Sequence, residues 1–141
     1  MAHARTTIRT AVMTACTGLT TTGSNISSSR VYAHEDLPSL AVYTDNELVT
    51  EQSGQMQWRD LTLIVEGRAQ AATDVDDTLD TICAEVETAL GGDSALAALC
   101  TCTYAGVDIE YSGAGDQPVA LAHISFVLQY QVNESDPTTI I

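Results

Sequence analysis

A long alternation of apolar residues near the C-terminus constrains the fold of this chain more than any other feature. From Pro118 onward every second residue is apolar, which is the period expected of a strand with one buried face. A strand of this length buries its apolar face only against another layer, so other elements must cover it. The residues that share this face are Ala120, Ala122, Ile124, Phe126, Leu128, Tyr130 and Val132.

The segment from Asp74 to Leu90 predicts an amphipathic helix. Its apolar residues recur at the spacing of one helical face, and Gly91-Gly92 follows as a stop signal. Acidic residues crowd the first turn, where the positive end of the helix dipole stabilises negative charge. The apolar stripe consists of Val75, Leu79, Ile82, Val86 and Leu90.

A second amphipathic pattern, from Arg5 to Leu19, predicts another helix, with Gly18 close to its end. Residues 93–99 predict a short helical turn. We expect strands over Arg30–Ala33, over Leu40–Tyr43, from Trp58 to Glu66, and over Cys100–Tyr111, the last joined to the strand from Pro118 by a turn at 112–117. Along Cys100–Tyr111 the alternation predicts one face with Ala105, Val107, Ile109 and Tyr111, and the other with Tyr104, Asp108 and Glu110.

Two segments show no clear period. Thr44–Gln57 contains few apolar residues, several acids and Gly54, which predicts a long exposed loop or a flexible hairpin tip. Residues 133–141 predict a tail that is loose or ordered only on contact. We therefore expect one domain over residues 1–132, followed by this C-terminal tail.

The expected elements predict an α+β fold. Two amphipathic helices and about four to five strands favour a two-layer sandwich, with both helices packed on one face of a mixed or antiparallel sheet. A chain of 141 residues is long enough for a single core. The helical stripes, together with Phe126 and Leu128, should form that core.

The charge of the chain excludes several classes of function. Nineteen acidic residues accompany five arginines and no lysine, and the formal net charge is −14. Specific nucleic-acid binding requires cations that displace the counterions of phosphate, and anionic membranes attract basic surfaces, so we expect neither kind of partner. A Walker-type phosphate site and Schiff-base catalysis both need a lysine, and both are excluded. No apolar run approaches the length of a membrane span.

The cysteines raise the question of a metal or catalytic site. We expect all four thiols to be reduced and mostly buried. Cys100 and Cys102, completed by His123, His34 or Cys16, would supply zinc ligands, but the pair lacks the usual turn between ligands. Cys102 and His123 would form a nucleophile pair on neighbouring strands, although no oxyanion hole or orienting group accompanies them. We therefore assign no catalytic residue, no metal ligand and no cofactor.

The arginines are the only cations that can pair with the many carboxylates. They form either weak surface pairs within the chain or pairs with acids of a neighbouring subunit. Both alternatives stay open at this point.

Several segments, in their order along the chain, resemble the tail terminator proteins of long-tailed phages, the minor tail protein U family. The resemblance covers nearly the whole chain up to Val132. The segments are the helix that begins Arg5-Thr-Thr-Ile-Arg9, Leu37-Pro-Ser-Leu-Ala-Val-Tyr43 before an acidic loop, Arg59-Asp-Leu-Thr-Leu-Ile-Val-Glu66, the helix from Asp77 to Leu90, and a closing hairpin from Tyr104–Glu110 to Val119–Tyr130.

This resemblance implies a structural virion protein rather than an enzyme. Members of the family form a ring, usually of six subunits, at the head-proximal end of the tail tube. The ring stops tube polymerisation and offers a surface for head attachment, after assembly in the host cytoplasm. The implied partners are copies of the chain, the tail tube protein and a head-completion or connector protein, with DNA passing through the ring. Head–tail joining proteins share a similar α+β fold and are the alternative.

We expect two groups of residues to make these contacts. Arg5, Arg9 and Arg30 would form one patch of a ring interface, opposite the acidic helix 74–90, because a ring needs two different complementary patches on each subunit. Asp45, Glu47 and Glu51, in the segment 44–57, would contact the tube or line the channel, where like charge prevents DNA from sticking.

Overall fold

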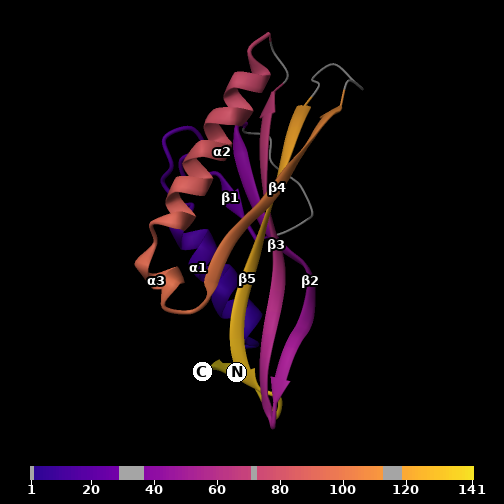
Figure 1. Ribbon diagram of the computed structural model, residues 1–141. Helices are drawn as coiled ribbons and strands as arrows, with labels where there is room; N and C mark the ends of the chain where they lie inside the picture. The colour runs from indigo at the N-terminus through magenta and orange to yellow at the C-terminus, as the bar shows by residue number, and fades with distance from the viewer. Residues whose placement is uncertain (1, 29–36, 71–72, 113–118) are drawn as a thin grey trace.

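A curled, mixed sheet forms one layer of the computed structural model, which describes residues 2–28, 37–70, 73–112 and 119–141 (Figure 1). Its strands are Ile26–Ser27 (β1), Ser39–Ser53 (β2), Met56–Gln70 (β3), Thr101–Ser112 (β4), Val119–Asn133 (β5) and Asp136–Ile140 (β6). Within the described residues the order is β1-β2-β3-β5-β4, and β6 pairs with β5. The pairing of β1 with β2 is parallel, and the other pairings are antiparallel.

Helices cover one face of this sheet. They are Ala4–Ala15 (α1), Val75–Gly91 (α2) and the short Ser94–Ala97 (α3), and Figure 1 shows them on the same side of the strands. The α+β fold with two substantial helices and a mixed sheet is confirmed. The described part of the chain has six strands rather than four to five, because β1 and β6 are too short to leave a periodic pattern in the sequence.

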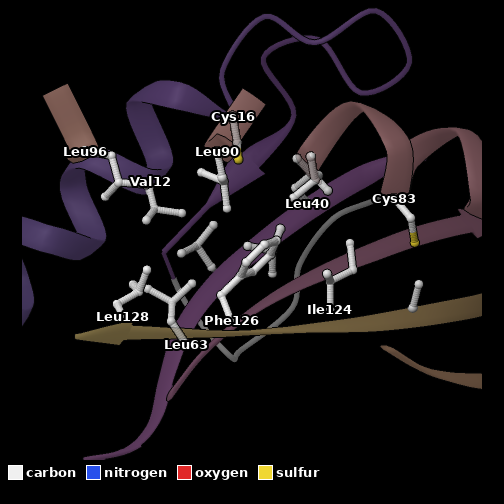
Figure 2. Packing of buried hydrophobic residues seen from close by; sticks show 14 of the residues in the cluster. Val12, Cys16, Leu40, Leu63, Cys83, Leu90, Leu96, Ile124, Phe126 and Leu128 are labelled. Carbon is white, nitrogen blue, oxygen red and sulfur yellow. The ribbon is translucent and has the colours of Figure 1, made fainter. Parts of the chain in front are cut away.

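The core lies between the helices and the predicted apolar face of β5. All seven residues of that face are buried, among them Phe126 and Leu128. Figure 2 shows Phe126 and Ile124 pointing from β5 toward residues of the helical layer. β3 approaches α2 closely at Gly67, where an added Cβ would lie 2.9 Å from Cγ2 of Ile82. The prediction of the core is therefore confirmed.

The helix predicted over 74–90 is also confirmed. α2 begins at Val75, after Asp74, and Asp76 and Asp77 lie in its first turn. Every residue of the predicted apolar stripe is buried. The helix therefore has negative charge at the positive end of its dipole and one apolar face that is buried.

The first helix is shorter than predicted. α1 ends at Ala15 rather than Leu19, and Gly18 then adopts φ +86°, which only glycine tolerates readily. The chain folds back through a bridge between Leu19 and Gly23. Glu85 of α2 holds this loop, because Thr21 donates hydrogen bonds to its carboxylate from both the backbone N–H, at 2.8 Å, and the hydroxyl, at 2.5 Å.

Of the two alternatives predicted for 44–57, the long exposed loop is wrong, and the segment is instead the end of a hairpin. β2 and β3 run through this segment and turn only at Gly54 and Gln55. The strand residues there are mostly exposed, because the hairpin extends past the helical layer (Figure 1). With no face to bury, the segment needs no apolar alternation, so the sequence carries no strand signal.

The C-terminal residues are not a loose tail. Asp136–Ile140 form β6, and Val132 of β5 pairs with Ile140. The strand predicted over 30–33 and the turn over 113–117 lie outside the described residues. None of the described helices has the length and apolar character that crossing a membrane requires.

Candidate interaction surfaces

A cluster of polar side chains around Glu47 closes one end of the core. A bulge interrupts the pairing of β2 with β3 between Thr44 and Asn46, and the extra residue, Asp45, reverses the faces of the residues that follow. Glu47 consequently points to the helical side, opposite Leu61. Only 12% of its side chain is exposed.

Three side chains from distant parts of the chain converge on this carboxylate. Arg5 of α1 donates from Nη1 to Oε2 of Glu47 at 2.8 Å, and Nη1 of Arg59 lies 3.5 Å from the same oxygen. The buried hydroxyl of Tyr130 donates to Oε1. Burial, followed by this hydrogen bond, raises the pKa of Tyr130 to about 12. Arg5 therefore has a partner within the chain, and Glu47 is not a free acid.

A second polar cluster lies on the opposite face of the sheet. Glu66 is 2% exposed, Nε of Arg68 donates to its Oε2 at 2.9 Å, and Nε2 of His123 lies 2.7 Å from its Oε1. The hydroxyl of Tyr43 donates to the same Oε1 at 3.3 Å. Burial raises the pKa of the Glu66 carboxyl, while His123 and the Tyr43 hydrogen bond act in the opposite direction.

An acidic groove of about 590 Å³ opens beside this second cluster. His123, predicted on the solvent or interface face, is half-buried at its edge, with 23% of the side chain exposed. The groove is lined by Tyr43, Asp45, Ile64, Asp108, Ile109, Glu110, His123 and Ser125. Its surface attracts cations rather than anions, in agreement with the charge of the whole chain.

The predicted Cys102–His123 pair does not form. Cys102 lies opposite Leu128 on β5, whereas His123 lies opposite Asp108. The two positions are separated by five residues of strand, or about 16 Å. A proton transfer between these side chains is excluded by that distance.

The cysteines do not assemble a metal site in the described residues. No group of three potential ligands is found there, and His34 lies outside them. The four thiols are free, and Cys16, Cys83 and Cys100 are buried. Burial raises the pKa of Cys16 and of Cys100 to about 12 and that of Cys102 to about 11, so these thiols stay protonated at neutral pH.

The other predicted contact residues lie apart from one another. Arg9 is half-buried on α1, one turn after Arg5, and forms no ion pair with the described residues. Asp45 is exposed in the bulge of β2, and Glu51 is exposed further along the same strand. Arg30 lies outside the described residues.

Two apolar surfaces, which the sequence did not reveal as such, are exposed on this acidic chain. The first, the hairpin end, consists of Leu48, Met56 and Trp58 on one face of the sheet and Val49 on the other, and these residues are 37–62% exposed. The second, the β4 strip, consists of Tyr104, Val107, Ile109 and Tyr111, which are 39–63% exposed.

The β4 strip differs from the predicted face of this strand. A bulge between Tyr104 and Gly106 places Tyr104, rather than Ala105, on the side of Val107 and Ile109. Gly106 has φ +148°, a conformation that side chains disfavour. A glycine within a strand pattern was the signal for this bulge.

Two comparisons with known proteins find no relative of this chain. No family model matches the chain, and a search of the curated proteins finds no match.

Proposed function

We propose that this protein is a tail terminator, a structural subunit that caps a phage tail tube, stops its polymerisation and offers a surface for head attachment. The observation that carries the proposal is the hairpin end. β2 and β3 extend past the helical layer (Figure 1), and their end exposes Leu48 and Trp58 in a chain of net charge −14. Exposed apolar clusters of this kind are typical of protein contacts.

The arrangement of the two apolar surfaces supports a ring stacked on a tube. The hairpin end lies at one end of the long strands, whereas the β4 strip lies along one lateral edge of the sheet. A stacked ring needs one surface for the neighbouring ring and others for its own copies. We assign the hairpin end to the tail tube and the lateral surfaces to the other subunits.

The exposed acids fit a channel that DNA passes through. Asp45 and Glu51 lie on the exposed part of β2, and like charge there would keep DNA from adhering to the ring. Glu47 is omitted from this role because it pairs with Arg5 and Arg59.

Removal of the gene from its parent genome tests the proposal. Electron microscopy of the resulting lysate should show overlong tubes without attached heads, and supplying the wild-type chain should restore tails of uniform length. Tails of normal length that lack heads would instead assign the protein to head–tail joining. Normal infectious particles would reject both roles.

The hairpin end itself is tested by complementation with a Leu48→Ser, Trp58→Ser double variant. Leu48 is 62% exposed, whereas Trp58 is 37% exposed, so a thermal melt must first show that the variant is folded at the temperature of the assay. The folded variant should leave tubes overlong, because the apolar contact to the tube is lost. A matched Thr81→Ser variant on the exposed surface of α2 should restore normal tails.

A further inference from the structure

We propose that the hairpin end binds an arginine of the tail tube subunit, with the guanidinium stacked on Trp58 and hydrogen-bonded to Asp60 and Glu51. The inference rests on the proposed function, which assigns the hairpin end to the tube, and it names the chemistry of that contact. The register of β2 and β3, an uncompensated carboxylate and the positions of the arginines of this chain support it.

Two acidic and two apolar side chains form a square near the end of the β2–β3 hairpin. Glu51 lies directly opposite Trp58, and Leu48 lies directly opposite Asp60, so the side chains of each pair share a face of the sheet. Trp58 and Asp60 are two residues apart on β3, which places both pairs on the same face, away from the helices. The two acids therefore lie on one diagonal of the square, and Trp58 and Leu48 lie on the other.

Within the described residues, the acids of this square have no cationic partner. Neither carboxylate forms a hydrogen bond or an ion pair with another residue that the structure describes. Asp60 is half-buried, and its Oδ1 is buried and has no hydrogen-bond partner in the described part of the chain. A carboxylate that is partly removed from water without a partner costs free energy, and a cation bound beside it lowers that cost.

Each arginine that the structure describes lies elsewhere. Arg5 and Arg59 share Glu47 on the helical side of the sheet. Arg68 pairs with a carboxylate further along β3. Arg9 lies on α1, in the helical layer across the sheet (Figure 1). The cation that complements the square therefore comes from another molecule.

The square fits an arginine better than a lysine. A planar guanidinium stacks on the face of an aromatic ring and donates hydrogen bonds in a fixed fork that matches carboxylates. Trp58, 37% exposed, supplies the ring, and Leu48, 62% exposed, supplies an apolar contact beside it. In the assembled tail, Glu51 borders both the tube contact and the channel, whereas Asp45 is further from the turn and faces the channel alone.

The fluorescence of Trp58 reports on this site directly, because Trp58 is the single tryptophan of the chain. The probe is a blocked pentapeptide in which leucine and arginine alternate, titrated into the purified protein at low ionic strength. In two control peptides, lysine or the neutral arginine analogue citrulline replaces arginine. We expect a saturable change in Trp58 emission with the arginine peptide, weaker binding of the lysine peptide and no binding of the citrulline peptide. Equal binding of either control peptide, or no response to any of the three, would overturn the proposal.

An Asp60→Asn, Glu51→Gln double variant should bind the arginine peptide about tenfold more weakly than the wild type. The matched control is an Asp108→Asn, Glu110→Gln double variant, which removes the same two charges from β4 on the same face of the sheet. Thermal melts must first show that both variants are folded. Equal losses of affinity would reveal a general attraction of cations to an acidic chain and would overturn the proposal.

Arg9 of a second copy is the alternative source of the cation. Analytical ultracentrifugation of the protein without peptide tests this alternative. We expect the Asp60→Asn, Glu51→Gln variant to sediment as the wild type does. A wild-type oligomer that dissociates both in this variant and in Arg9→Gln would assign the square to a contact between copies and overturn its assignment to the tube.

Complementation separates this inference from the proposed function. The Asp60→Asn, Glu51→Gln variant should leave tubes overlong when it replaces the wild-type chain. If removal of the gene gives overlong tubes but this variant restores tails of normal length, only this inference falls. If the arginine peptide binds as expected but removal of the gene leaves normal tails, the arginine-binding surface stands and the tail role falls.

Discussion

Nη1 of Arg5 lies 2.8 Å from Oε2 of Glu47 and so joins the first helix to the β2–β3 hairpin. Arg59 and Tyr130 contact the same carboxylate, and Glu47 reaches them only because the bulge at Asp45 turns it toward the helices. The sequence allowed the arginines to pair within the chain or between subunits. For Arg5 the pairing within the chain is present.

Replacement of this carboxylate should destabilise the protein. We expect Glu47→Ala to lower the free energy of unfolding by about 3 kcal/mol, because Arg5, Arg59 and the buried Tyr130 hydroxyl lose their shared acceptor. Glu51→Ala, on the exposed part of the same strand, should change it by less than about 0.5 kcal/mol. Urea unfolding of both variants tests the difference. A loss for Glu47→Ala as small as that for Glu51→Ala would show that the cluster does not stabilise the fold.

The close approach of β3 to α2 predicts that Gly67 tolerates no side chain. In Gly67→Ala the new Cβ would lie 2.9 Å from Cγ2 of Ile82, so we expect a loss of about 1–3 kcal/mol from overpacking. Gly91→Ala is the control, because a Cβ there meets nothing within 4 Å and alanine favours the helix. Thermal melts should move in opposite directions, and a Gly67→Ala protein as stable as the wild type would disprove the contact.

Phe126 should contribute a large part of the stability that comes from the core. Its side chain is 2% exposed between the sheet and the helices (Figure 2), so Phe126→Ala should cost about 3–5 kcal/mol. Gln129→Ala, on the exposed side of the same strand, controls for changes to β5 that leave the core intact. A melting temperature for Phe126→Ala within a degree of the wild type would contradict the assignment.

Alkaline pH should weaken the fold through Tyr130. Its pKa is raised to about 12 in the folded protein, against about 10 in an unfolded chain. Between these values the folded state holds a proton that the unfolded state has lost, so stability falls as the pH rises through pH 10–12.

The comparison of Tyr130→Phe with the wild type isolates this effect, because the buried thiols titrate in both proteins. The stability of the wild type should fall more steeply, by up to about 1.4 kcal/mol per pH unit over this range. Parallel stability curves, measured by urea unfolding at each pH, would show that the Tyr130 proton is not coupled to folding.

The elements that could be predicted are those whose residues meet the core. α2 and β5 each place one apolar face against the other layer, so burial imposes a period of 3.6 or 2 on their sequences. That period is a property of a few neighbouring residues and is therefore visible without the fold.

Tertiary structure alone decided the rest, because the relevant contacts join residues far apart in the chain. The end of the β2–β3 hairpin has both faces in solvent, and β6 is held by pairing with β5, so neither segment needs a periodic sequence. The bulges at Asp45 and Ala105 each reverse which residues of their strand face the helices. The first bulge brings Glu47 to its partners, and the second places Tyr104 on the same face as the rest of the β4 strip. The sequence by itself determined a helix-covered sheet with an acidic surface; the register of its strands determined which residues that surface presents.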